Sequence, residues 1–343
     1  MPTRIFITSP LEPEHVERIR AVDRARVDVA YAPDLLPPTR YIGDHVGAPF
    51  QRTQQQQRRW HEELGAAEVM WDVPRNVEEL ALTRRLRWVQ MTSTGVGQLM
   101  KNLGLRSDVL VTTARGVHAA PLAEFVFMVL LAYWRGLGHL QAEQRAHRWT
   151  RYCGEGVAGR RIAVIGAGDL ARGLAERARV FEMTTVAIAR DTGKTRAHDG
   201  LFDEIRPRRD LHAVLASADA VVVTVPHTPE TGGMIDRAAF AAMKPGAVFV
   251  NIARGQVIDE AALLDGLRGG RIGFAALDVA STEPLPAESP FWDLPNVLIS
   301  PHSASTVVGE NAKIVDIFCW NLRCWLDGRL GEMRNVLDKE RMY

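Results

Sequence analysis

The feature that most constrains this chain is a glycine-containing turn between an apolar run and a helix-like segment. Residues 162–165 are consecutive apolar residues, typical of a buried strand, and Gly166 and Gly168 follow them directly. Residues 170–181 have the pattern of a helix, and residues 185–189 are a second apolar strand. A β-α-β unit with such a turn directs backbone N–H groups and a helix N-terminus at a pyrophosphate. Two glycines alone can also only end a strand, so the motif needs support from the rest of the chain.

The alternation of strand-like and helix-like segments continues on both sides of this turn. Downstream, strand-like runs lie at residues 221–225, 247–251, 273–277 and 297–299. Upstream, shorter strand-like runs lie at residues 4–8, 27–31, 67–71, 86–91 and 109–112. This pattern predicts an α/β protein with a doubly wound parallel sheet over about residues 157–299 and a second α/β region before it. A long helix starting at Pro121 is apolar nearly all round over residues 122–134, so we expect it to be buried between domains or subunits.

The composition excludes several classes of protein. Lys and Arg total 42 and Asp and Glu total 41, so the net charge of +1 gives no electrostatic reason to expect a nucleic-acid partner. Three cysteines form neither an even disulfide framework nor a C-x-x-C pair, which suits a reducing compartment and suggests no metal site. The N-terminus enters a strand pattern without a secretory apolar segment, and the longest apolar run, residues 119–134, falls short of a membrane span. We expect a cytoplasmic protein without a membrane partner.

Three polar residues, Arg254, Glu283 and His302, lie just past the ends of predicted parallel strands. Ligand crevices of open α/β sheets lie outside these ends. Taken singly, the three can be a surface charge, a capping residue before proline and a loop histidine. Together with the glycine turn they favour a nicotinamide enzyme. The turn at Thr94 and Gly95, which also ends a strand, either offers N–H groups to a carboxylate or is only a turn.

Several segments together resemble the D-isomer-specific 2-hydroxyacid dehydrogenase family, and the resemblance extends over nearly the whole chain. They are Gly166-Ala-Gly168, Val250-Asn-Ile-Ala-Arg-Gly255, Asp278-Val279 with Glu283-Pro-Leu-Pro286, Trp292-x-x-Pro295-Asn-Val297, Pro301-His302 and Gly116-Val-His-x-x-Pro-Leu-Ala-Glu124. The resemblance implies a Rossmann-type NAD(P)-binding domain, residues 116–302, inserted into a flavodoxin-like substrate domain. Both chain ends, residues 1–115 and 303–343, would form that substrate domain, and the resemblance also implies a homodimer.

The resemblance further implies that Arg254, Glu283 and His302 are catalytic in reducing a small 2-keto acid to a D-2-hydroxy acid. His302 would be the acid, because an imidazole changes charge near pH ~6.5 and a neighbouring carboxylate, here Glu283, favours its protonated form. Arg254 would hold the substrate carboxylate and polarise the carbonyl. Thr94 and Gly95 resemble the family's second carboxylate anchor. Formate dehydrogenases of similar fold carry Gln at the position of Glu283, so that branch is disfavoured. Because an arginine stands at the cofactor position, we expect a glyoxylate/hydroxypyruvate reductase-like branch or a broad 2-keto acid reductase.

The residues after the second strand bear on the cofactor. An acidic residue there accepts from the ribose 2′-OH of NAD, whereas this chain has Ala189 followed by Arg190. Because an arginine can pair with a 2′-phosphate, we place NADP ahead of NAD, although Asp191 can turn back toward the ribose. The predicted cofactor-binding residues are Gly166, Gly168, Asp169, Leu170, Arg190, Pro226, Thr231, Ala253 and Asp278.

Two other interpretations stay open at this point. A dinucleotide-sensing scaffold, as in the C-terminal-binding protein corepressors, shares this architecture and keeps the same three polar residues. A catalytically idle homologue would bind the dinucleotide without turnover. The given sequence ends 41 residues after His302, so we expect no appended regulatory domain of the kind that some phosphoglycerate dehydrogenases carry.

Overall fold

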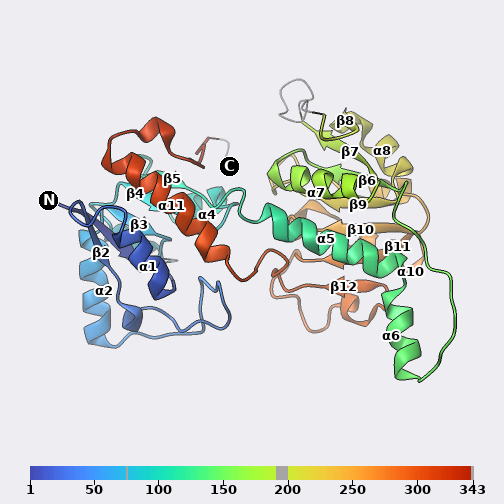
Figure 1. Cartoon of the computed structure of the whole chain (residues 1–343), viewed down its shortest axis with the longest axis horizontal. Helices are drawn as coiled ribbons and strands as arrows, with labels where there is room; N and C mark the ends of the chain where they lie inside the picture. Colours follow the sequence, from blue (N-terminus) through green and yellow to red (C-terminus); the bar gives the residue numbers. More distant parts are fainter. Residues whose placement is uncertain (75, 191–199, 341–343) are drawn as a thin grey trace. The chain divides into compact units, whose positions relative to one another are not determined.

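The computed structural model describes residues 1–74, 76–190 and 200–340 (Figure 1). The chain divides into two compact units. Unit 1 consists of Met1–Val117 together with Thr306–Tyr343, and unit 2 consists of His118–Ser305. Unit 2 is therefore an insertion in the sequence of unit 1.

Unit 1 is built around a parallel sheet with the strand order β2-β1-β3-β4-β5. Its strands are β1 (Thr3–Ile7), β2 (Val27–Ala30), β3 (Val69–Trp71), β4 (Trp88–Gln90) and β5 (Leu110–Thr112). Its helices are α1 (Pro13–Arg20), α2 (Gln54–Ala66), α3 (Val77–Ala81), α4 (Gly97–Asn102) and α11 (Glu310–Leu326), with short 3-10 turns at η1 (Pro33–Leu35) and η6 (Leu330–Glu332). This strand order is the flavodoxin-like one.

Successive side chains of β1 point to opposite faces of the unit 1 sheet and therefore belong to two different hydrophobic cores. Ile5 and Ile7 face a cluster that includes α1 and α11, whereas Phe6 faces a cluster that includes α2 and α3. The segment after α11 also pairs with this unit, because Leu337 N–H donates to the carbonyl of Val111 at 2.8 Å. Both chain ends thus contribute to one folded unit.

Unit 2 is built around a parallel sheet with the order β12-β11-β10-β9-β6-β7-β8. Its strands are β6 (Arg161–Ile165), β7 (Thr184–Ala189), β8 (Glu204–Pro207), β9 (Ala220–Val223), β10 (Ala247–Asn251), β11 (Ile272–Leu277) and β12 (Val297–Ile299). Its helices are α5 (Ala119–Trp134), α6 (Leu137–Arg145), α7 (Asp169–Val180), α8 (Leu211–Ser217), α9 (Arg237–Ala242) and α10 (Glu260–Arg268), and its 3-10 turns include η3 (Arg208–Asp210), η4 (Gly255–Val257) and η5 (Pro290–Asp293). The direction in which strands are added reverses between β6 and β9, as in dinucleotide-binding folds.

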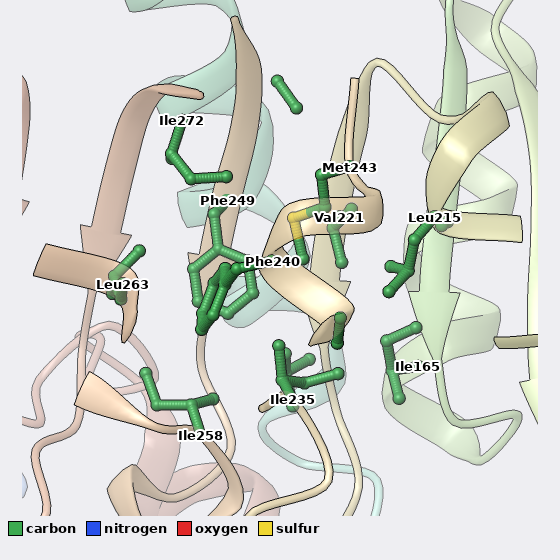
Figure 2. Close-up of a cluster of buried hydrophobic side chains, with 14 of the residues drawn as sticks. Ile165, Leu215, Val221, Ile235, Phe240, Met243, Phe249, Ile258, Leu263 and Ile272 are labelled. Carbon is green, nitrogen blue, oxygen red and sulfur yellow. The ribbon is translucent and has the colours of Figure 1, made fainter. Parts of the chain in front are cut away.

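Helices cover both faces of the unit 2 sheet. On one face α5 and α7 lie side by side (Figure 1), and both pack on Ile162 and Val164 of β6. The other face packs against α8, α9 and α10, and Figure 2 shows part of that core, including Ile165, Phe240 and Phe249. The predicted α/β fold with a doubly wound parallel sheet is confirmed, as is its association with a flavodoxin-like sheet.

Two local expectations were incomplete. The sequence predicts six strands in the larger sheet, whereas the described residues of unit 2 contain a further edge strand, β8, of sequence EIRP. The helix expected from Pro121 begins at Ala119 and ends at Trp134, because Gly136 adopts a left-handed backbone with φ of 68° before α6 begins. Glu182, in the turn after α7, has a positive φ of 55°, a backbone conformation that is uncommon for a residue other than glycine.

Within the described residues, no single helix is long and apolar enough to cross a membrane. The helices α5 and α6 meet the length and composition criteria only as a pair bent by 60°. Among the same residues, no group of three or more His, Cys, Asp and Glu side chains is placed to hold a metal ion.

Candidate active site

The carboxyl ends of three neighbouring strands bring Arg254, Glu283 and His302 onto one edge of the unit 2 sheet. Arg254 follows β10, Glu283 follows β11 and His302 follows β12. Because these strands are adjacent and parallel, their carboxyl ends meet at the same edge. The topology therefore gathers a cation, a carboxylate and an imidazole that are distant in the sequence.

His302 and Glu283 form a hydrogen-bonded pair. Nδ1 of His302 lies 2.8 Å from Oε2 of Glu283, and both side chains are partly exposed, at 45% and 38%. The other carboxylate oxygen of Glu283 accepts a hydrogen bond from the N–H of Ala280 at 3.1 Å. With Nδ1 engaged, the Nε2 atom of the imidazole is left for proton exchange with a ligand.

The backbone of His302 adopts a left-handed conformation, with φ of 53°. This uncommon geometry for a non-glycine residue is held by a hydrogen bond from the His302 N–H to the carbonyl of Asp278 at 2.8 Å. The loop after β12 is thereby attached to the end of β11. Imidazole and carboxylate are positioned by the same two strand ends.

Asp278 anchors this loop through its side chain. The carboxylate is buried, and Oδ1 accepts hydrogen bonds from Ser300 Oγ at 2.6 Å, from Ser303 N–H at 2.8 Å and from Ala304 N–H at 2.9 Å. The residues on either side of His302 are therefore held by one carboxylate. The sequence places Asp278 among the cofactor-binding residues and does not predict these three hydrogen bonds to the loop.

Asn251 organises the backbone around Arg254. Its buried amide donates to the carbonyl of Arg254 at 3.0 Å and accepts from the N–H of Ala253 at 3.1 Å. The guanidinium of Arg254 donates to the carbonyl of Ala253 at 2.6 Å and is half-buried. Asn251 was not predicted as a site residue. The available signal was a polar side chain at the end of a strand that is otherwise buried and apolar.

The backbone of Gly255 packs directly against the loop that carries Glu283. A Cβ atom at position 255 would lie 2.0 Å from the carbonyl carbon of Ala280 and 2.1 Å from the nitrogen of Ser281. Next to it, Gln256 Nε2 donates to the carbonyl of Ser281 at 3.0 Å. Only glycine fits this contact between two backbones, so Gly255 sets the separation of the two loops.

The glycine turn after β6 has the geometry expected of an anion-binding turn. Gly166 has φ of 123°, and a Cβ atom there would lie 2.5 Å from Oγ1 of Thr224. Gly168 is the N-cap of α7 and provides no side-chain cap, and a Cβ atom built on it meets nothing within 4 Å. Open space in front of an uncapped helix N-terminus fits a pyrophosphate, so this turn suits a dinucleotide. Asp169 and Leu170 form the first turn of α7.

The remaining predicted cofactor residues lie on the same edge of unit 2. Pro226 is exposed after β9, and its carbonyl accepts a hydrogen bond from the Thr231 hydroxyl at 2.6 Å. Ala253 is buried after β10. Arg190 directly follows β7 and lies 3.9 Å from Glu230. Asp191 lies outside the described residues.

Thr94 and Gly95 belong to unit 1, where they follow β4. Thr94 is half-buried and Gly95 is exposed. The preceding residue, Ser93, accepts a hydrogen bond from the N–H of Ala114 at 3.2 Å, which fastens this turn to the segment after β5. The turn thus has a defined backbone at the carboxyl end of the unit 1 sheet.

Comparison with known proteins gives a consistent assignment. A family model described as D-isomer specific 2-hydroxyacid dehydrogenase, NAD binding domain, matches residues 127–304. D-3-phosphoglycerate dehydrogenase of Mycobacterium bovis is 35% identical over 245 residues, which are 71% of this chain and 46% of that protein, so the chain spans about half of its length. Glyoxylate reductase of Thermococcus gammatolerans is 33% identical over 255 residues, which are 72% of this chain and 75% of that protein.

Solved structures agree with the sequence relatives. A D-isomer specific 2-hydroxyacid dehydrogenase family protein from Aeromonas salmonicida matches with a TM-score of 0.83 and 27% identity, covering 99% of this chain and 100% of the other. A D-isomer specific 2-hydroxyacid dehydrogenase from Xanthobacter autotrophicus, in complex with NADPH and MES, matches with a TM-score of 0.77 and 26% identity, covering 100% of both chains.

Proposed function

Because the chain belongs to the D-isomer specific 2-hydroxyacid dehydrogenase family, we propose that it reduces a small 2-keto acid, such as glyoxylate or hydroxypyruvate, to a D-2-hydroxy acid. The observation that carries this proposal is the hydrogen-bonded pair of His302 and Glu283 on the same sheet edge as Arg254. An acid, its carboxylate partner and a fixed cation are the groups that carbonyl reduction requires from a protein. The glyoxylate reductase relative supports the substrate class.

Each side chain has a distinct task in this proposal. Arg254 binds the substrate carboxylate and carbonyl oxygen through its forked donors, and these contacts fix the carbonyl carbon. His302 donates a proton from Nε2 to the alkoxide oxygen as it forms. Glu283 accepts from Nδ1, which keeps the imidazole in one orientation and stabilises its protonated form. When bound, the nicotinamide cofactor supplies the hydride.

The cofactor is held, in this proposal, by the edge that carries the glycine turn. Gly166 and Gly168 accommodate the pyrophosphate at the N-terminus of α7, with Asp169 and Leu170 beside it. We place NADP ahead of NAD, because Arg190 follows β7, where the ribose 2′ position is recognised. The NADPH complex of the Xanthobacter relative supports this preference.

The two units have separate roles in the proposed enzyme. Unit 2 is the NAD(P)-binding domain and supplies the catalytic residues, and unit 1 is the substrate domain. Within unit 1, we propose the N–H groups around Thr94 and Gly95 as an anchor for a carboxylate. We propose a cytoplasmic location, because the three cysteines suit a reducing compartment.

The proposal includes a homodimer. Five large apolar side chains between residues 128 and 152 are exposed in unit 2: Met128, Leu137, Leu140, Trp149 and Tyr152. Exposed apolar groups gathered on one segment are typical of a surface that another protein chain covers. Size-exclusion chromatography with light scattering should show a dimer, and a monomer at micromolar concentration would contradict this part of the proposal.

A single set of assays tests the function. Oxidation of NADPH and of NADH is measured against glyoxylate, hydroxypyruvate, pyruvate and bulkier 2-keto acids. His302→Asn should lower turnover by at least about 100-fold while the affinity for NADPH stays within about twofold, because the imidazole moves the proton and does not bind the cofactor. Unchanged turnover in this variant would disprove the assignment of His302. Dinucleotide binding without turnover on any 2-keto acid would instead favour a sensing scaffold or an idle homologue.

A further inference from the structure

Two exposed arginines occupy equivalent positions at the carboxyl ends of the neighbouring strands β7 and β8. The last residues that pair between these parallel strands are Ala189 and Pro207. Arg190 follows Ala189, and Arg208 follows Pro207. Because adjacent strands lie about 4.8 Å apart, the two arginine backbones are neighbours, and η3, which begins at Arg208, contacts β7. The edge strand therefore places a second cation beside the one that the sequence predicted.

Arg208 differs from the arginines around it, which lie in surface ion pairs. Arg206, on β8 itself, lies 3.0 Å from Glu204. Among the described residues, the side chain of Arg208 has neither a hydrogen bond nor an ion-pair partner, and Arg208 is exposed. Arg190 lies 3.9 Å from Glu230, a distance at which an exposed pair contributes little. Arg208 thus adds an exposed positive charge beside that of Arg190, and two positive charges at one edge of a sheet attract an anion.

We infer that Arg208 and Arg190 together bind the 2′-phosphate of NADP, which makes Arg208 a residue that determines cofactor specificity. In a dinucleotide-binding sheet, the end of the strand after the glycine turn recognises the 2′ substituent of the adenosine ribose. A phosphate monoester carries a charge of about −1.5 to −2 near neutral pH, so a single guanidinium leaves it incompletely neutralised. Two forked guanidinium groups can share its three terminal oxygens. This inference rests on the proposed function, which accounts for a dinucleotide at this edge.

Arg209 provides a matched control for Arg208. It is the next residue in η3, its side chain is 84% exposed, and it lies 3.9 Å from Asp210. Replacing either arginine by alanine removes the same charge from the same turn, so both changes alter the long-range electrostatic potential alike. A difference between the two variants therefore reports direct contact with the ligand.

The experiment measures binding by the full chain in isothermal calorimetry, with four ligands: NADPH, NADH, 2′,5′-ADP and 5′-AMP. The variants are Arg208→Ala, Arg208→Gln and Arg209→Ala. Loss of Arg208 should raise the Kd of NADPH and of 2′,5′-ADP by about 5- to 30-fold, the range between an exposed ion pair and a charged hydrogen bond. The Kd values of NADH and 5′-AMP should change by less than about twofold in the same variants, which also shows that they fold. Arg209→Ala should leave all four values within about twofold.

The outcomes separate this inference from the proposed function. Equal effects of Arg208→Ala and Arg209→Ala on NADPH, or equal effects on NADPH and NADH, would overturn the role of Arg208 while reduction of 2-keto acids by the unaltered chain still supports the proposed function. A wild-type preference for NADH would overturn the arginine pair and the NADP assignment together, and would leave the dehydrogenase proposal standing. Failure of the wild-type chain to bind any of the four ligands would overturn both.

Discussion

Nδ1 of His302 lies 2.8 Å from Oε2 of Glu283, although the two residues are 19 positions apart in the chain and follow different strands. The carboxylate of Glu283 also accepts a hydrogen bond from the N–H of Ala280, and the N–H of His302 donates to the carbonyl of Asp278. The relative position of acid and carboxylate therefore depends on main-chain hydrogen bonds at the ends of β11 and β12. This arrangement pre-orients the imidazole before any substrate binds.

Glu283→Gln tests whether the carboxylate acts on the imidazole. The amide can still accept from Nδ1, but it no longer stabilises the protonated ring, so kcat should fall by about 10- to 100-fold. The KM for NADPH should stay within about twofold, because the carboxylate acts through His302 and not on the cofactor. Glu288→Gln removes a charge from the same loop at an exposed position and should leave steady-state kinetics unchanged. An equal decrease of kcat in both variants would show that the net charge of the loop, and not the contact of Glu283 with His302, determines turnover.

Those parts of the site that depend only on strand order could be predicted from the sequence. Residues 162–165 and 247–250 are apolar throughout because both faces of a parallel strand are buried, so the polar residues that follow them stand out. The strand β8 was missed for the opposite reason. At the edge of the sheet its residues Glu204–Pro207 are largely half-buried or exposed, and no apolar pattern is required there.

The connections between the loops could not be predicted from the sequence. The tight contact of Gly255 with Ala280, and the three hydrogen bonds to Asp278, depend on backbone positions in loops from different strands. A residue type alone does not reveal which N–H groups will converge on a carboxylate. The same holds for Arg208, which lies next to Arg190 only because β8 pairs with β7.

Gly255→Ala should be strongly disruptive. The added methyl group would lie 2.0 Å from the carbonyl carbon of Ala280, so the loop that carries Glu283 must move. Overpacking of this kind typically lowers the free energy of unfolding by about 1 to 3 kcal/mol, and here it should also lower kcat by more than about tenfold. Thermal unfolding and steady-state kinetics check both effects. Gly138→Ala, in α6 where a Cβ atom meets nothing within 4 Å, should keep full activity.

Gly168→Ala should have the opposite profile. A Cβ atom at this N-cap meets no protein atom within 4 Å and φ is −83°, so the change should alter the free energy of unfolding by no more than about 1 kcal/mol. The methyl group would instead enter the space in front of α7 and should raise the Kd of NADPH and of NADH together, by at least about tenfold. Calorimetric binding and thermal unfolding, measured side by side, distinguish the two effects. Unaltered affinity for both dinucleotides would mean that the pyrophosphate binds elsewhere.

Glu230→Gln should strengthen the binding of NADPH. Arg190 follows β7 and Glu230 follows β9, so their 3.9 Å contact spans the end of β6, which lies between these strands and carries the glycine turn. The carboxylate competes with a phosphate for the guanidinium. Removing the Glu230 carboxylate should lower the Kd of NADPH by about two- to fivefold, which corresponds to the free energy of an exposed ion pair, and should leave the Kd of NADH unchanged. Glu176→Gln, exposed on α7, removes the same charge and should change neither. A weaker NADPH complex in Glu230→Gln would contradict competition.

Asp44→Asn should destabilise unit 1 in a pH-dependent manner. The buried carboxylate accepts hydrogen bonds from the Arg40 side chain and from the N–H groups of Arg40, Val46 and Gly47, at distances between 2.8 and 3.1 Å. The hydrogen bonds from the Arg40 guanidinium lower the pKa of Asp44 well below its usual range, and the main-chain N–H groups add to this effect. Loss of this charged network should lower the free energy of unfolding at pH 7 by about 2 to 4 kcal/mol.

The sign of the pH effect follows from this lowered pKa. A carboxyl group with a lower pKa in the folded state contributes its full stability above its unfolded value of about 3.9, and loses that contribution as the pH falls toward the folded value. The difference between wild type and Asp44→Asn, measured by urea unfolding, should therefore be constant from pH 7 to about pH 5 and should shrink below about pH 4. Asp34→Asn removes an exposed carboxylate that pairs with Arg59 and should lower stability by at most about 1 kcal/mol. An Asp44→Asn difference that grows on acidification would contradict the proposed role of the ionised carboxylate.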